Sequence, residues 1–220
     1  VESLRSLRTA LQFAMLHAPN RVIMLTGSTP GIGKSFISAN LAAIMAATGK
    51  RVLLIDADMR KGHLHDVFGV KRSPGLSELV ANVQPLEPVL RPQVVAGLDL
   101  IPGGAIPPNP AELLLSLSTR DWLQRLQDQY DLVLIDTPPV LAVSDACVLA
   151  QRAGTVLLVA RAETTTLGEL QETAKRLAQA GGSVRGVVFN GLDFKRRYGY
   201  GYGYRYQRYD YGTPPKAPKA

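Results

Sequence analysis

Short runs of aliphatic residues alternate with longer amphipathic stretches along most of the chain, and this alternation predicts its elements. The aliphatic runs are Val22–Leu25, Val52–Ile55, Leu98–Ile101, Leu132–Ile135, Thr155–Ala160 and Val184–Phe189. Helical spacing of apolar residues marks 2–17, Lys34–Ala47, Arg120–Gln129, Val143–Gln151 and Leu167–Ala180. The runs lack two-residue alternation, which is typical of strands buried on both faces. We therefore predict an α/β fold, a mainly parallel sheet with helices on both faces.

Other parts of the chain lack this pattern. Residues 84–97 and 102–112 are rich in proline, and we expect them to be surface loops. From residue 198 the sequence is of low complexity, dominated by tyrosine, glycine and arginine, and it has no apolar periodicity from which to build a core. We therefore divide the chain into a domain at 1–194 and a disordered or adaptable tail at 195–220.

The formal net charge of +7 lies almost entirely in this tail. Residues 195–220 carry seven basic side chains against one acid, so residues 1–194 have a net charge of only +1. A basic globular surface for nucleic acid is therefore not expected. The single cysteine excludes an intrachain disulfide, and no apolar run reaches the roughly 18 residues of a membrane span.

Residues 28–35, STPGIGKS, lie between the first predicted strand and the helix that follows it. A phosphate-binding loop requires this strand–loop–helix context, because backbone N–H groups and the helix N-terminus surround the phosphates. Ser28 replaces the usual first glycine of the GxxxxGK[ST] pattern, although Gly27 stands one place before it. Lys34 is expected to reach the β- and γ-phosphates, and the Ser35 hydroxyl to bind Mg²⁺. The predicted nucleotide contacts are Thr29, Pro30, Gly31, Ile32, Gly33, Lys34, Ser35 and Phe36.

Acidic residues stand at the ends of two further strands. Asp56 and Asp58 belong to LLIDADMR at 53–60, and Asp136 belongs to LVLIDTPP at 132–139. The carboxyl ends of parallel strands meet at one edge of the sheet, where ligands collect. Magnesium prefers oxygen ligands and often needs only one or two carboxylates. We therefore predict a metal site built from Ser35, Asp56, Asp58 and Asp136, close to Lys34.

Together, GSTPGIGKS, LLIDADMR and LVLIDTPP resemble the Walker A, A′ and B motifs of the bacterial tyrosine kinases, the cytoplasmic kinase domains associated with polysaccharide co-polymerases. Residues 2–8, ESLRSLR, resemble the family's ExxRxxR oligomerisation motif, and 107–114, PPNPAELL, resemble its PPNPxELL segment. The tail resembles the family's terminal tyrosine cluster, so the resemblance covers essentially the whole chain. One departure is Gly62, where the family usually has proline.

The resemblance implies a P-loop kinase that uses ATP and Mg²⁺ to phosphorylate its own C-terminal tyrosines in trans, with ATP hydrolysis as a side activity. It implies that Lys34 steadies the transferred phosphate and that Asp136 holds Mg²⁺ through water and the geometry of Ser35. Asp56 and Asp58 would handle Mg²⁺ and help to deprotonate or orient the attacking hydroxyl; the residues do not tell which of them is the base. The implied phosphoacceptors are Tyr198, Tyr200, Tyr202, Tyr204, Tyr206, Tyr209 and Tyr211.

The resemblance also implies partners. Glu2, Arg5 and Arg8, at i, i+3 and i+6 of a helix, would join subunits into a ring, an octamer in this family. The implied partners are a transmembrane polysaccharide co-polymerase region, fused or separate, and a phosphotyrosine phosphatase, at the inner face of the bacterial plasma membrane. Assembly and disassembly of the ring would regulate the synthesis and export of exopolysaccharide or capsule.

Several alternatives stay open. Partition and cell-division ATPases share the fold, but Thr29 stands where they carry a signature lysine. A nucleotide-gated module with an adhesive or RNA-binding tail is a second alternative. Asn190 either contacts adenine or forms an Asn-Gly turn. Arg60 either supports the phosphates or pairs with a nearby acid, and Arg161 either approaches the nucleotide or forms a surface ion pair.

Overall fold

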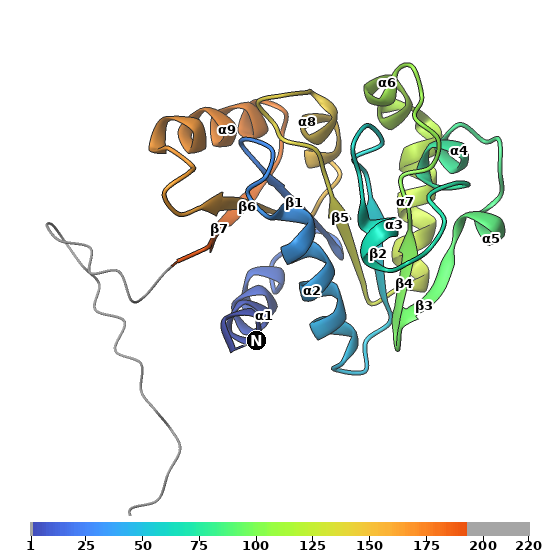
Figure 1. Ribbon diagram of the computed structural model, residues 1–220, viewed down its shortest axis with the longest axis horizontal. Helices are drawn as coiled ribbons and strands as arrows, with labels where there is room; N and C mark the ends of the chain where they lie inside the picture. Colours follow the sequence, from blue (N-terminus) through green and yellow to red (C-terminus); the bar gives the residue numbers. More distant parts are fainter. Residues whose placement is uncertain (1, 193–220) are drawn as a thin grey trace, which may run out of the picture.

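A computed structural model describes residues 2–192 of the chain (Figure 1). Within these residues, one sheet has the strand order β3-β4-β2-β5-β1-β6-β7, and only the β3–β4 pair is antiparallel. The strands are β1 (Val22–Gly27), β2 (Val52–Asp56), β3 (Arg91–Val95), β4 (Leu98–Ile101), β5 (Leu132–Asp136), β6 (Thr155–Arg161) and β7 (Val184–Asn190). The predicted mainly parallel sheet is confirmed.

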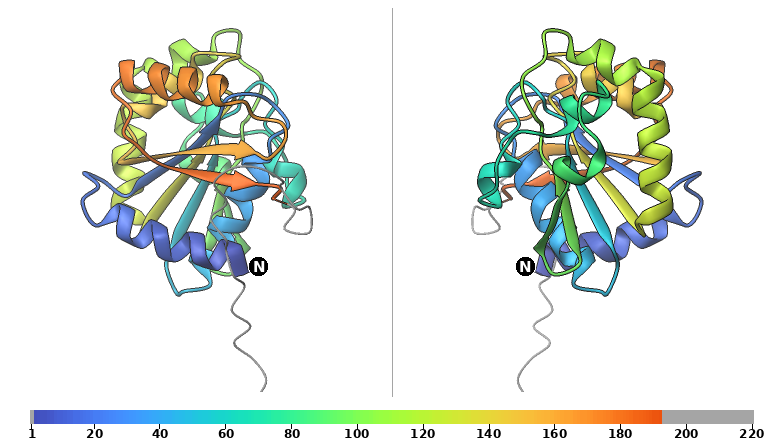
Figure 2. Two further views of the ribbon diagram at one scale, coloured as in Figure 1. Left: turned by 90° about the vertical axis from the view of Figure 1, so that its left-hand side faces the viewer. Right: turned by 90° about the vertical axis from the view of Figure 1, so that its right-hand side faces the viewer.

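Helices cover both faces of this sheet (Figure 2). They are α1 (Glu2–Met15), α2 (Lys34–Ala46), α3 (Leu64–Val67), α4 (Leu76–Val80), α5 (Leu86–Val89), α6 (Pro110–Leu115), α7 (Leu117–Gln129), α8 (Asp145–Ala150) and α9 (Leu167–Gln179). Helices α1, α2 and α3 contribute to one apolar cluster, and α4 to α9 contribute to the other. In the described part of the chain, no helix has the length and hydrophobicity needed to cross a lipid bilayer.

The central strands are apolar throughout because each of their two faces packs into a different apolar cluster. In β1, Val22 and Met24 enter the cluster under α4 to α9, whereas Ile23 and Leu25 enter the cluster under α1 and α2. All four side chains are fully buried, and burying each stabilises the fold by about 1.5–3 kcal/mol. In contrast, β7 alternates half-buried and exposed residues, as an edge strand does.

The predicted helix boundaries are wrong at α7 and α8. Helix α7 begins at Leu117, before the predicted Arg120, because the Ser116 hydroxyl caps it by accepting the N–H of Thr119. Helix α8 begins at Asp145, after the predicted Val143. The N–H groups at 140 and 141 donate instead to the carbonyls of residues 27 and 28, which fastens this turn to the phosphate loop. Helix α1 ends at Met15, two residues before the predicted end.

The prediction of irregular loops is also wrong in part. Residues 84–97 contain α5 and β3, and β3 pairs with β4 across a turn at Gly97, whose φ is 76°. Pro92 fits there because an edge strand has backbone groups that need no ladder partner. Helix α6 begins with Pro110 at its first position, where a missing N–H costs nothing. Residues 195–220, the predicted tail, lie outside the described residues.

Candidate active site

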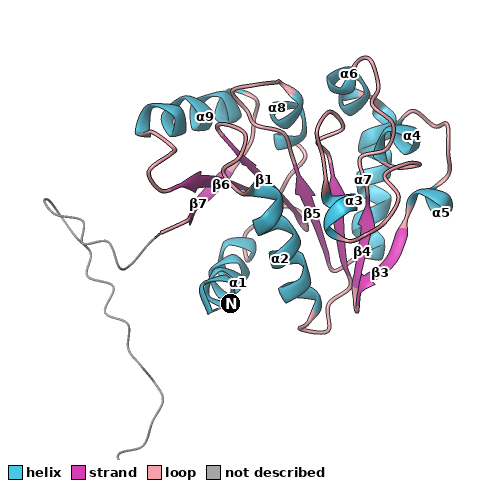
Figure 3. Ribbon diagram, in the orientation of Figure 1, coloured by secondary structure: helices cyan, strands magenta, loops and turns pink. Residues whose placement is uncertain are grey.

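The loops that follow β1, β2 and β5 gather at the same end of the sheet (Figure 3). Strand β1 ends at Gly27, and α2 starts at Lys34, so the predicted strand–loop–helix context is confirmed. Gly31 and Gly33 have φ values of 76° and 91°, in the left-handed region that glycine adopts at low cost. The loop therefore curves sharply enough to present backbone N–H groups around an anion.

Lys34 and Asp136 lie together at the centre of this end. The Lys34 side chain is only 8% exposed, and burial lowers its pKa, although the charges of Asp136 and Asp58 oppose that shift. Asp136, at the end of β5, accepts a hydrogen bond from the Ser38 hydroxyl at 2.9 Å and another from Ser35. Burial raises the pKa of Asp136 to about 6, against the lowering effect of these hydroxyls and of Lys34.

Asp56 ends β2 directly opposite Asp136 in the adjacent strand β5. Its carboxylate is fully buried and accepts the N–H groups of Asp58, at 3.2 Å, and Leu64, at 3.1 Å. Burial first, and then the charge of Asp136, raise the pKa of Asp56 to about 7. A Cβ at Gly62 would collide with this carboxylate, so the loop closes over Asp56 only because residue 62 is glycine. A proline, which would place a Cβ at this position, cannot occupy it in the same loop conformation.

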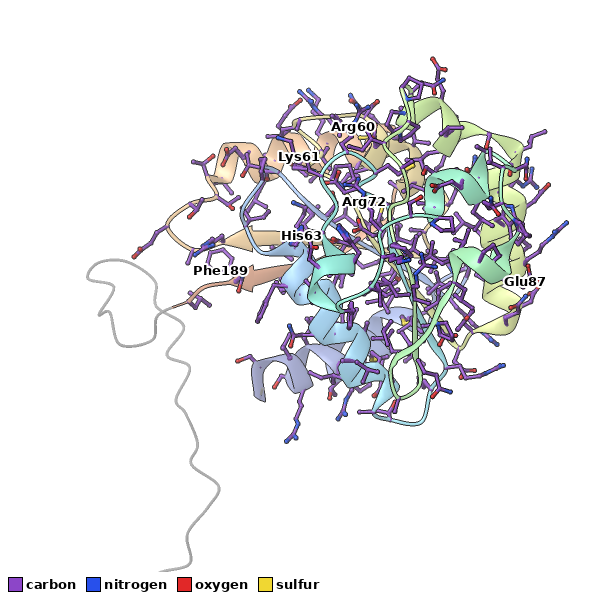
Figure 4. The ribbon with its side chains drawn as sticks, turned by 45° about the vertical axis from the view of Figure 1, so that its right-hand side comes forward. Arg60, Lys61, His63, Arg72, Glu87 and Phe189 are labelled. Atoms are coloured by element: carbon purple, nitrogen blue, oxygen red, sulfur yellow. The ribbon has the colours of Figure 1, made fainter. Side chains whose placement is uncertain are left out.

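The loop after β2 positions Asp58 and Arg60. Asp58 is partly buried, and one carboxylate oxygen accepts the N–H groups of Arg60, at 3.2 Å, and Lys61, at 2.8 Å. The Arg60 guanidinium binds both carboxylate oxygens of Asp145, at 3.1 and 3.4 Å, and Asp145 is fully buried at the start of α8. Figure 4 shows Arg60 and Lys61 side by side on this loop. Arg60 thus pairs with an acid, and its contact with phosphates stays a prediction.

Hydrogen bonds from the segments around Arg72 and Gly104 stabilise the loop that carries Asp58. Arg72 donates to the carbonyl of Gly104 at 2.9 Å and to that of Met59 at 2.8 Å. The Glu78 carboxylate accepts the N–H of Ala105 at 3.1 Å. Burial alone would raise the pKa of Glu78, but hydrogen bonds from its neighbours lower this pKa to about 2. This network fixes the backbone on which Asp58 is carried.

Two residues at strand ends contact the phosphate loop from its outer side. The Asn190 amide, at the end of β7, donates to the carbonyl of Ile32 at 3.0 Å, and its predicted contact with adenine stays a prediction. The Arg161 guanidinium, at the end of β6, donates to the carbonyl of Gly31 at 3.0 Å. Arg161 therefore lies against the phosphate loop, and its approach to the nucleotide stays a prediction. Phe36 is 61% exposed on α2.

The arrangement fits a divalent metal beside a bound phosphate chain. Among residues 2–192, no three His, Cys, Asp or Glu side chains are placed to hold a metal by themselves. Magnesium in phosphate sites is held by one or two protein oxygens together with phosphates and water. The Ser35–Asp136 hydrogen bond supplies such a pair of oxygens, next to the buried amine of Lys34. The chemistry of these donors therefore fits the metal better than a cage made only of protein side chains.

Sequence reasoning did not identify Ser38, Asp145 or Arg72 as parts of the site. Ser38 follows Lys34 by one helical turn, and this spacing is a signal that would have placed it on the same face of α2. Asp145 and Arg72 carry no comparable local signal, because their partners Arg60 and Met59 lie 85 and 13 residues away.

The phosphate loop and the buried aspartates at the adjacent strand ends define a P-loop nucleotide-binding domain. Residues 20–183 match the family model described as AAA domain. The kinase domain of the Escherichia coli tyrosine kinase ETK is similar with a TM-score of 0.86 and 45% identity, over 92% of this chain and 80% of that one. The chain belongs to the AAA domain family and, within it, to the bacterial tyrosine-kinase domains.

Two other proteins show how much of a full-length relative the chain covers and how far the fold extends beyond the kinases. A putative tyrosine-protein kinase, EpsB of Ralstonia solanacearum, is 58% identical over 227 residues, covering 100% of this chain and 30% of the relative. The chain thus spans less than a third of the length of this curated relative. The septum site-determining protein MinD of Pyrococcus horikoshii shares the fold with a TM-score of 0.65 at 24% identity, over 77% of this chain and 70% of that one, and this likeness shows the fold alone.

Proposed function

We propose that this domain is a protein tyrosine kinase that transfers the γ-phosphate of ATP, with Mg²⁺, to tyrosines of its own tail in trans. The observation that carries the proposal is the convergence of Lys34, Asp58 and Asp136. Lys34 begins the helix after β1, Asp58 lies in the loop after β2 and Asp136 ends β5; the three strands are neighbours in the sheet, and the three charges interact with one another. A cation and carboxylates beside a phosphate loop are the groups that phosphoryl transfer needs.

Each side chain has a distinct task in this proposal. The N–H groups of the phosphate loop hold the phosphates, and Lys34 stabilises the charge on the transferred group. Ser35 and Asp136 hold Mg²⁺, which when bound offsets the negative charge of the phosphates. Asp56 and Asp58 orient the tyrosine hydroxyl and accept its proton, because free tyrosine, with a pKa near ~10, is a weak nucleophile at neutral pH.

The tail is the proposed substrate. Seven of the eight tyrosines stand beyond residue 197, outside the described residues. The eighth, Tyr130, is 7% exposed, and its hydroxyl donates to Asp99 at 2.6 Å, so it is a poor acceptor. Each phosphate adds about −1.5 to −2 charge, so four neutralise or reverse the tail's net charge of +6, and five or more reverse it. A basic tail is attracted to a neighbour's carboxylate-lined site, and a phosphorylated tail is repelled from it.

Mixing two variants tests both the activity and its trans direction. One chain carries Lys34→Met and an intact tail; the other is active but has Phe at all seven tail tyrosines. With ATP and Mg²⁺, we expect stepwise phosphate gains between residues 198 and 211 on the Lys34→Met chain only, and none on Tyr130, measured by intact mass and peptide mapping. ADP formed without phosphotyrosine would replace the proposal with a switch ATPase. RNA binding that survives high salt, again without phosphotyrosine, would favour the binding module.

We further propose that the chain assembles through α1 into a ring, an octamer. Arg5 and Arg8 lie three residues apart on α1, so they share one side of the helix and can pair with acids of an adjacent subunit. Charge reversal of the tail then weakens the ring. The ring stands at the inner face of the plasma membrane beside a polysaccharide co-polymerase region, and a phosphotyrosine phosphatase restores it.

Light scattering of the unphosphorylated chain tests this contact. We expect the Arg5→Ala/Arg8→Ala variant to shift from a large assembly to a monomer, because the proposed ion pairs lose their cations. Arg125→Ala, on the exposed surface of α7, serves as the control and keeps the wild-type mass. An identical mass for the double variant and the wild type would rule out the α1 contact.

A further inference from the structure

The ends of β6 and β7 hold two successive carbonyl groups of the phosphate loop. Arg161 and Asn190 are directly paired neighbours on these strands. The Arg161 guanidinium donates to the Gly31 carbonyl and the Asn190 amide to the Ile32 carbonyl, both at 3.0 Å. Gly33 lies so close to the Asn190 amide that a Cβ there would overlap it.

The two donors are themselves well anchored. The N–H after Arg161 donates to the carbonyl of Asn190 at 2.9 Å, which locks the two strand ends together. The N–H of Arg161 donates to the Thr165 hydroxyl at 2.9 Å, and the Arg161 stem packs beside Gly191, where a Cβ would lie 3.6 Å from Cγ. The loop carbonyls therefore meet donors whose positions are set by the sheet.

Peptide geometry connects these carbonyls to the anion site. In a trans peptide, the carbonyl of one residue and the N–H of the next point in opposite directions. Fixing the Gly31 carbonyl towards Arg161 therefore turns the N–H of Ile32 away from Arg161, and fixing the Ile32 carbonyl does the same for the N–H of Gly33. Without such contacts, the glycines at 31 and 33 leave these peptide planes free to rotate.

We propose that Arg161 and Asn190 are positioning residues that preorganise the phosphate loop, by holding the N–H groups of Ile32 and Gly33 towards the phosphates. The proposal rests on the proposed binding of ATP. In this proposal Asn190 acts without contacting the adenine base of the nucleotide, and Arg161 acts without contacting the nucleotide at all. Both residues then contribute to phosphate binding whichever nucleobase the ligand carries.

Binding of ATP and of inorganic tripolyphosphate, each with Mg²⁺, tests the proposal by calorimetry on the full chain. We expect Arg161→Ala and Asn190→Ala each to weaken the binding of both ligands by the same factor, about tenfold, the equivalent of one lost hydrogen bond. The KM for ATP rises by a similar factor while kcat changes little, because the loop binds ground state and transition state alike. Arg161→Lys keeps a cationic donor and restores most of the affinity.

Arg185→Ala is the matched control, because it removes an exposed arginine from β7 itself. It leaves both affinities at the wild-type value, which separates the carbonyl contact from a general loss of positive charge. Thermal unfolding of every variant verifies that it is folded, and Asn190→Ser replaces Asn190→Ala if that variant unfolds.

Three results would overturn the inference. If Asn190→Ala weakens ATP but not tripolyphosphate, the residue acts on the base. If neither alanine variant changes either affinity, the carbonyl contacts have no role in binding. If the folded wild type binds neither ligand, the proposed function fails, and the inference fails with it. If the wild type binds ATP but the variants bind it equally tightly, only the inference fails.

Discussion

Lys34→Met is expected to lower autophosphorylation of the tail by ~1,000-fold or more, because the transferred phosphate loses its buried cation. Lys34 is only 8% exposed, and its amine interacts with the charges of Asp136 and Asp58, so methionine leaves these carboxylates without their buried cation. Methionine has a similar length and no charge to desolvate, and the fold should therefore survive the substitution. Intact mass over a time course with ATP and Mg²⁺ measures the loss.

Lys61→Met is the matched control for this experiment. Lys61 is exposed on the loop after β2, close to the site, and its side chain takes no part in the proposed chemistry (Figure 4). The control should keep the wild-type rate. Retention of more than about a tenth of the rate by Lys34→Met would show that the transferred phosphate does not depend on this amine.

Asp136→Asn is expected to abolish kinase activity and, in the metal-free protein, to raise the free energy of unfolding by about 1 to 3 kcal/mol at pH 7. Burial raises the pKa of Asp136 to about 6, so at neutral pH the folded protein holds a charge that water would solvate better. Asparagine removes that charge. The hydroxyls of Ser35 and Ser38 can rotate to accept from its amide.

The pH dependence gives this prediction its sign. A carboxyl whose pKa is higher in the folded protein stabilises the fold while it is protonated, and this contribution is lost as the pH rises through the ordinary value of 3.8 towards about 6. The gain in the free energy of unfolding from Asp136→Asn should therefore be absent near pH 3 and complete near pH 7. Denaturant unfolding in EDTA measures it, with Asp128→Asn, an exposed acid on α7, as the control. An advantage that stays constant with pH would contradict the assigned cause.

The sequence was sufficient to predict those parts of the fold that depend on local pattern. The doubly buried strands β1, β2, β5 and β6 follow from uninterrupted aliphatic runs, because both faces of each strand meet a helix layer. The convergence of Lys34, Asp56 and Asp136 follows from the same pattern, since parallel strands deliver their carboxyl ends to one edge.

The remaining features depend on contacts between distant parts of the chain. Strand β3 is mostly exposed and contains a proline, so its residues resemble a loop until β4 pairs with them. The contact of Arg161 with Gly31 spans 130 residues, and although a position at a strand end allows Arg161 to lie near the site, no local pattern specifies the Gly31 carbonyl as its partner. The requirement for glycine at position 62 likewise comes from a tertiary contact, because the Asp56 carboxylate fills the space beside it.

The ion pair between Arg60 and Asp145 has a consequence for how related sequences diverge. Asp145 is fully buried whereas Arg60 is partly exposed, so losing Arg60 alone leaves a buried carboxylate without its cation and destabilises the fold. Replacing both residues by neutral ones avoids this destabilisation. The two positions, 85 residues apart, should therefore covary in an alignment of bacterial tyrosine-kinase domains, each acid retained or lost together with its arginine.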